Sequence, residues 1–141
     1  MAEARFEKLT ASETVLYGPR KLLLCGFGRE AQPKFQTVLS MAGLADVPLV
    51  WAAAEDAAAI VGELFQRVDG YGAGVGSALP RAIIVAGITE KELLALMHVC
   101  KKFGMKTALW ATLTPTSETW TLEVLLEELS AERRQLDRKR R

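Results

Sequence analysis

The sequence predicts an α/β protein in which a four-stranded, mostly parallel sheet carries helices on both faces. Two observations lead to this prediction. Short, continuous apolar segments, each suited to a strand buried on both faces, alternate with longer segments whose apolar residues recur at helical spacing. The order strand, helix, strand, helix then occurs twice within 141 residues, which predicts one three-layer domain built from two similar βαβα halves.

The first half is predicted over residues 21–67, after an arm at residues 1–20 that contributes a short strand around residues 14–17. Its first strand ends at Gly26. A helix follows between Pro33, a residue suited to the first helical position, and Gly43, which favours a left-handed stop. The predicted strand, helix, strand and helix of this half cover residues 22–25, 33–42, 47–52 and 55–67.

The second half is predicted over residues 81–141, after a glycine-rich linker at residues 68–80. Thr89 and Glu92 have the spacing of a capping box, in which each side chain accepts a hydrogen bond from the backbone amide of the other residue. They therefore mark a helix start. The predicted strand, helix and strand of this half cover residues 82–86, 89–103 and 107–111, and the last helix runs from about residue 120 into a basic tail.

The two halves agree in the order of their elements and in the phase of their apolar residues, which predicts an internal repeat. Few of the matched residues are identical. The predicted equivalent positions are Gly26 and Gly87, Phe35 and Leu96, Val38 and Val99, Gly43 and Gly104, and Val50-Trp51 and Leu109-Trp110.

A ligand site is predicted where the winding direction of the sheet reverses. If each half winds outward from its own first strand, the strand order is 2-1-3-4, and ligands of open α/β sheets bind at such a reversal, outside the carboxyl ends of the strands. The expected walls of this crevice are Gly26, Phe27 and Gly28 after the first strand, and Gly87, Ile88 and Thr89 after the third.

Two glycine-containing segments could approach a phosphate, and both have simpler interpretations. Residues 26–28 lie between a strand and a helix but lack the third glycine of a dinucleotide fingerprint and the lysine of a P-loop, so a tight turn is favoured. Residues 70–77 precede a strand rather than a helix, which favours a flexible linker and leaves a lid open as the alternative.

The segment 112–121 concentrates hydroxyl groups between the last strand and the last helix. Thr114, Thr116 and Ser117 could bind an anion together with free backbone amides, although capping of the helix is the favoured interpretation. Trp120 is predicted to be structural, pinning this loop to the core.

No residue pattern predicts a catalytic centre, a metal site or a cofactor. Cys25 and Cys100 lie in apolar patterns and are expected to be small buried residues rather than a redox pair. His98, the only histidine, is expected to face solvent or lie at a boundary, since no nearby carboxylate or cysteine completes a catalytic or metal-binding set.

The charge of the chain is unevenly distributed. Residues 133–141 carry six basic residues and one acidic residue, so the rest of the chain has a net charge of −4 although the whole chain has +1. A nucleic-acid-binding domain would spread its basic groups over a folded face, so nucleic acid is not the expected partner. With neither a signal-peptide pattern nor a long apolar run, the chain is expected to be cytosolic and not membrane-bound.

Residues 114–122, with the sequence TPTSETWTL, and the following Leu125-Leu126-Glu127-Glu128-Leu129 resemble a bacterial family catalogued as domain of unknown function 3783. The resemblance covers about residues 81–134. It implies a bacterial cytosolic protein and supplies no chemistry. The first half lacks this motif, having Ala52-Ala53-Ala54-Glu55 at the corresponding place.

Two functions follow from these observations. The first is a non-enzymatic binding or regulatory module, because no titratable cluster is predicted at the strand ends. The second is a small enzyme or enzyme subunit acting on a phosphorylated or carboxylated molecule, which would use residues 26–28 and 112–121. The sequence leaves a small anionic ligand, a protein partner and a homo-oligomer open as partners.

Overall fold

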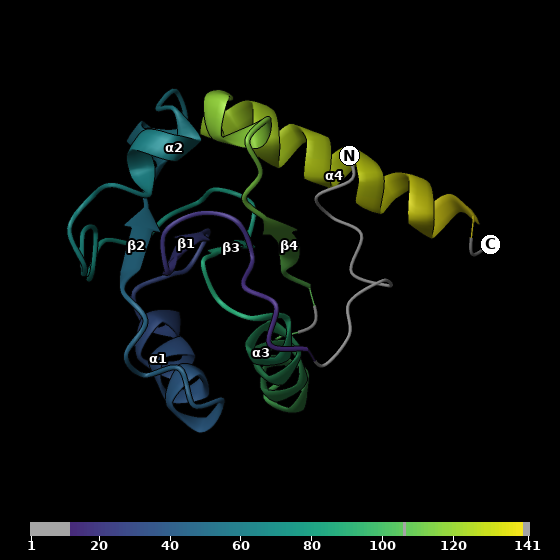
Figure 1. Ribbon diagram of the computed structural model, residues 1–141. Helices are drawn as coiled ribbons and strands as arrows, with labels where there is room; N and C mark the ends of the chain where they lie inside the picture. The colour runs from purple at the N-terminus through teal and green to yellow at the C-terminus, as the bar shows by residue number, and fades with distance from the viewer. Residues whose placement is uncertain (1–11, 106, 140–141) are drawn as a thin grey trace.

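The computed structural model describes residues 12–105 and 107–139 (Figure 1). Most of the predicted N-terminal arm and the last two arginines of the basic tail lie outside these ranges. The elements in chain order are β1 (Lys21–Cys25), α1 (Ala31–Met41), β2 (Leu49–Ala52), the 3-10 helix η3 (Ala54–Asp56), α2 (Val61–Leu64), β3 (Ala82–Ala86), α3 (Glu90–Lys102), β4 (Leu109–Thr112), the 3-10 helix η4 (Ser117–Thr119) and α4 (Leu122–Lys139).

The predicted three layers are present. Figure 1 shows α1 and α3 on one side of the sheet and α2 and α4 on the other. Alternate residues of each strand pack on opposite faces of the sheet, since successive side chains of a strand point in opposite directions. Leu22 and Leu24 pack with α1 and α3, whereas Leu23 and Cys25 pack with α2 and α4. Two apolar cores therefore enclose the sheet, one on each face.

The strand order β2-β1-β3-β4 agrees with the predicted order 2-1-3-4. The pairs β1–β2 and β3–β4 are parallel, as expected for strands joined by a crossover helix. The central pair is antiparallel, with Cys25 opposite Ala82 and Lys21 opposite Ala86. The sheet is therefore mixed. The expectation that the glycines after β1 and β3 lie at one common edge is wrong.

The direction of β3 is reversed because the chain crosses the sheet twice, not once, between β2 and β3. From the end of β2 it returns through η3 and α2 to the opposite edge, where the Arg67 carbonyl accepts a hydrogen bond from the Lys21 amine. The chain then crosses the sheet again, now alongside β2 and in the same direction as β2, with Tyr71 bridging Val50 in a parallel pairing. The predicted helix over residues 55–67 is replaced by η3 and the four-residue α2.

The glycine-rich segment predicted as a linker covers the outer edge of β2. The Gly70 amide donates to the Leu49 carbonyl, and the Trp51 amide donates to the Tyr71 carbonyl. Gln32 at the start of α1 donates to the Val75 carbonyl at 3.0 Å and accepts from the Gly74 amide at 2.8 Å. Pairing of this kind protects an edge strand from association with other chains. Hydrogen bonds from residues 70–75 thus attach this segment to β2 and α1.

Two antiparallel contacts join the halves, and both pair residues separated by the same distance along the chain. In the sheet Leu23 lies opposite Ile84, and in the α2–α4 layer Ile60 bridges Thr121. In the second contact the Val61 amide donates to the Trp120 carbonyl at 2.8 Å, and the Leu122 amide donates to the Ala59 carbonyl at 2.9 Å. The halves therefore meet at two places, one in the sheet and one in the α2–α4 layer.

The strand register corrects one of the predicted equivalences. Leu22 lies opposite Leu49 in the first half, and Ile83 lies opposite Trp110 in the second. The position equivalent to Trp110 is therefore Leu49, and the predicted match of Trp51 with Trp110 is two residues out of register. A shift of two preserves the side of the sheet to which a side chain points, so the apolar pattern alone could not detect it.

Candidate functional site

The walls of the predicted crevice lie at opposite edges of the sheet, and each is covered by another part of the chain. Gly26 has a φ of +75°, and a Cβ there would lie 2.3 Å from the Leu79 carbonyl oxygen. Gly87 has a φ of +68°, and a Cβ there would lie 2.3 Å from the Arg20 amide nitrogen. Both glycines are required because the backbone turns sharply beneath an adjacent segment. Within the described part of the chain, the two walls share no ligand crevice.

Phe27 and Gly28 belong to the structure that begins α1. Phe27 is buried, with its ring centroid 5.1 Å from that of Phe35 and 5.7 Å from that of Trp51. The Arg81 guanidinium lies over the Phe27 ring, 4.5 Å from the ring centroid. The Gly28 carbonyl accepts a hydrogen bond from the Ala31 amide at 3.0 Å. The favoured interpretation, a tight turn, accounts for both residues.

At the opposite edge, Ile88 is fully buried and Thr89 caps α3. The capping box is confirmed: the Glu92 amide donates to the Thr89 hydroxyl at 3.0 Å, and the Thr89 amide donates to the Glu92 carboxylate at 2.8 Å. Both carboxylate oxygens of Glu92 also accept hydrogen bonds from Arg20, each at 2.8 Å. The Arg20 guanidinium lowers the pKa of Glu92 to about 2. The negative charge of Glu92 is therefore paired with Arg20 within the protein.

The hydroxyl-rich loop after β4 is also bonded to itself. The Ser117 amide donates to the Thr114 hydroxyl at 3.0 Å, and the Thr114 amide donates to the Ser117 hydroxyl at 3.1 Å. Ser117 is fully buried, and the Thr116 carbonyl accepts from the Thr119 hydroxyl at 2.7 Å. Trp120 is partly buried against the core between the sheet and α4. The hydroxyls of Thr114 and Ser117 therefore stabilise the loop itself and do not cap α4, where the Thr121 hydroxyl accepts a hydrogen bond instead. The partial burial of Trp120 agrees with a structural role.

The reactive side chains considered in the sequence are not assembled into a centre. Burial raises the pKa of the Cys25 thiol to about 12 and that of the Cys100 thiol to about 11. The two thiols lie in the cores on opposite faces of the sheet and are free, as expected for small buried residues. His98 is exposed on α3. Among the described residues, no group of three or more His, Cys, Asp and Glu side chains could hold a metal ion.

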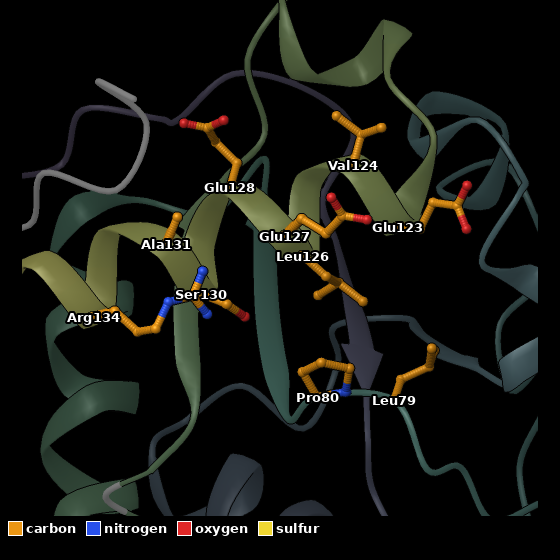
Figure 2. Close-up of a pocket in the computed structure, with 10 residues that line it drawn as sticks. All are labelled: Leu79, Pro80, Glu123, Val124, Leu126, Glu127, Glu128, Ser130, Ala131 and Arg134. Carbon is orange, nitrogen blue, oxygen red and sulfur yellow. The ribbon is translucent and has the colours of Figure 1, made fainter.

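A groove of about 580 Å³ lies between α4 and the segment that enters β3. Leu79 and Pro80 form one wall, and Figure 2 shows Leu126 pointing from α4 toward them. The acidic residues of the helix wall are Glu123, Glu127 and Glu128, and the remaining lining residues are Val124, Ser130, Ala131 and Arg134. The groove is open, and its lining includes three carboxylates and one guanidinium.

Sequence reasoning missed this groove. It interpreted the glutamates of the last helix as a solvated helix face, and nothing local to the helix shows that Leu79 and Pro80 lie beside them. The available signal was the charge distribution: Glu123, Glu127 and Glu128 lie in the first half of the helix, whereas the arginines all lie in the second half, together with Glu132 and Asp137. Such a distribution complements the helix macrodipole and also suits a surface that meets another charged surface.

The end of α4 extends away from the body of the protein, as Figure 1 shows. Thr121 begins the helix, its hydroxyl accepting a hydrogen bond from the Val124 amide at 3.4 Å. Leu122, Leu125, Leu126 and Leu129 are buried under the sheet. From residue 134 to residue 139 every described residue is exposed, including Leu136 at 53%. The basic end of the helix is thus a separate surface from the core-facing leucines.

The described residues define a three-layer α/β protein with filled strand ends and an acidic groove along its last helix. Residues 81–136 match the model of a family described as domain of unknown function (DUF3783). This match confirms the resemblance found in the sequence and extends from β3 into α4, while the first half lies outside it. No curated protein and no solved structure matches the chain. None of the described helices combines the length and apolar character needed to cross a membrane.

Proposed function

We propose that the chain is a non-enzymatic binding module whose binding surface is the groove between α4 and Leu79–Pro80, and whose partner is a positively charged protein segment. The observation that supports this proposal is the groove itself, with three glutamates along one wall and apolar residues along the other. Carboxylates select a cationic partner, and apolar contacts stabilise a protein segment more than a small ion.

The spacing of the glutamates supports a partner that supplies positive charge. Glu123 and Glu127 are four residues apart on the helix and therefore neighbours on its surface, where like charges destabilise a helix by a few tenths of a kcal/mol. Neither forms an ion pair with a described residue within 4.0 Å. A bound arginine or lysine between them would remove this repulsion.

The alternative of a small enzyme acting on an anionic molecule has less support. The residues expected to hold the anion pack against the chain itself: Leu79 covers Gly26, and the Ser117 and Thr114 hydroxyls bond each other. A thermal-shift screen of nucleotides, sugar phosphates and organic acids separates the two functions. Specific stabilisation that is lost in Gly28→Val would favour the enzyme, whereas the binding module predicts none.

The direct test measures binding of a fluorescently labelled arginine-rich helical peptide by anisotropy at low salt. We expect binding that weakens as salt is added, because the groove is exposed and its charges are screened. Glu123→Gln with Glu127→Gln should weaken binding at least tenfold. Glu55→Gln, an exposed glutamate on η3, is the matched control and should leave it unchanged. Equal affinity of the wild type and the double variant would exclude the groove.

We further propose that the two halves are copies of one unit and that the protein is bacterial and cytoplasmic. The equal separation of Leu23 from Ile84 and of Ile60 from Thr121 supports the copies, because both contacts then lie on one local two-fold axis. The similarity to the DUF3783 family supports the source and location. To test the relation between the halves, the second half is expressed alone and its mass in solution is measured. If the halves are copies of one unit, this fragment should form a two-fold homodimer through its β3 strand.

A further inference from the structure

Resting on the proposed function, the structure assigns a partner to the groove: we infer that a second copy of this chain binds there through α4. The two α4 helices lie antiparallel. The basic end of each helix lies along the acidic groove of the other copy.

The charged residues of α4 have the positions that this pairing needs. Glu123, Glu127, Arg134 and Arg138 are separated by four, seven and four residues, which places them along one side of an α-helix. Ser130 lies between them on the groove side and, with its neighbour Ala131, is small enough to let two helices approach closely. The acidic residues lie on one side of this crossing point and the basic residues on the other.

An antiparallel partner matches every charge of this stripe. With the helices crossing at residues 130–131, Glu127 lies opposite Arg134 of the second copy, and Glu123 lies opposite Arg138 of the second copy. Because the two-fold axis repeats each contact, the interface contains four ion pairs. A parallel pairing would instead place glutamates beside glutamates and arginines beside arginines. The basic half of the helix also contains two acidic residues: Asp137, near this side of the helix, and Glu132, which is turned away from it.

The helix macrodipole explains only part of this charge distribution. It favours acidic residues in the first turn and basic residues in the last turn, and its effect is lost beyond them. That accounts for Glu123 and Arg138. Glu127 lies in the second turn and Arg134 lies before the last turn, so their positions need another reason. Pairing with a second copy supplies one.

The exposed end of α4 gives an independent reason for a partner. The helix spans 18 residues, about 27 Å at 1.5 Å per residue, but residues 134–139 are all exposed. These residues continue a helix whose earlier part is packed against the core, but they have no tertiary packing of their own, which is the main source of helix stability in proteins. The groove of a second copy would provide that packing, with Leu79 and Pro80 as its far wall.

The test is sedimentation equilibrium of the full chain at low salt, combined with charge reversal. The wild type should have twice the mass of one chain. Glu127→Arg alone and Arg134→Glu alone should each be monomeric, because each places like charges opposite each other. A 1:1 mixture of the two variants should regain the dimer mass, since the introduced arginine then meets the introduced glutamate and the two unchanged residues meet each other. Glu55→Arg carries the same charge change away from the stripe and should remain dimeric.

A wild-type chain that stays monomeric at millimolar concentration overturns the inference, as does a dimer that survives Glu127→Arg. Failure of the mixed variants to associate also overturns it, provided that circular dichroism shows both to be folded. The arginine-rich peptide is then tested on Arg134→Glu, whose groove keeps all its glutamates. If self-association fails its test but Arg134→Glu binds the peptide, only the inference of a second copy is overturned and the proposed function stands. If Arg134→Glu does not bind the peptide either, both are overturned.

Discussion

The strand-end turns and the α4 groove are both places where a ligand could meet this protein, and they differ in what occupies them. At Gly26 and Gly87 another segment of the chain lies so close that no Cβ could be accommodated. Along α4 the side chains of Glu123 and Glu127 are exposed and bond to no described residue. A strand end in an α/β sheet is thus a binding site only when the chain leaves it open.

The largest effect should come from placing a side chain at Gly26. Gly26→Val introduces a branched side chain at a positive φ and against the Leu79 carbonyl, which together should lower the free energy of unfolding by about 3 kcal/mol or more. Urea denaturation measures the loss. Gly28→Ala is the matched control: its Cβ would come no closer than 3.7 Å to any atom, so its stability should stay within about 0.5 kcal/mol of wild type. Similar stability of both variants would show that the turn is open.

The next effect concerns the loop between β4 and α4. Trp120→Ala removes a partly buried indole from the core between the sheet and α4, which should cost about 2 kcal/mol, less than for a fully buried tryptophan. The unfolding midpoint of the purified protein should fall without any ligand present. Should the variant melt like the wild type, residues 112–121 would become a candidate binding loop and the contrast with the groove would weaken.

A smaller effect should appear as a pH dependence. The pKa of Glu92 is about 2 in the folded protein, lowered by the Arg20 guanidinium, against an ordinary value of 4.5. The unfolded chain therefore binds a proton first, and the stabilisation by this pair is complete above pH 4.5 and lost as the pH falls toward 2. Glu92→Gln should remove this part of the acid dependence. Because the pair is partly exposed, about 1 kcal/mol is expected. Parallel stability curves from about pH 6 to about pH 2 would exclude it.

The smallest effect on the folded monomer should come from the groove. Glu127→Gln changes an exposed side chain and should leave the free energy of unfolding of the monomer within about 0.5 kcal/mol of wild type. Guanidinium denaturation, in which salt suppresses ionic association, measures the monomer alone. A loss above about 1 kcal/mol would mean that Glu127 stabilises the fold, and the groove would then resemble the filled turns.

Much of the fold could be predicted because local patterns carry it. Apolar segments such as residues 22–25 have no other stable place than a buried strand, and the Thr89–Glu92 capping box marks the start of α3 from four residues alone. The burial of Cys25 and Cys100 follows in the same way. The predicted strand order is also confirmed, since each crossover helix determines which strand becomes its neighbour.

The direction of β3 could not be predicted from such patterns. Residues 55–67 contain enough alanine and apolar residues to form a helix, and only contacts with distant segments show that they form η3 and α2. Residues 68–72 have too little apolar character to be recognised as a strand, yet they run along β2 through backbone hydrogen bonds, which do not depend on side chains. This additional passage reverses the strand that follows.

The sequence by itself determined the elements outside residues 55–72, the two cores and the charge of the last helix, because each depends on residues close together along the chain. Tertiary structure alone decided which surfaces remain accessible. Leu79 covers Gly26 and also forms the far wall of the α4 groove, although it lies more than forty residues from either one along the chain. Whether a turn is filled or a groove is open depends on such distant neighbours, and no local pattern records them.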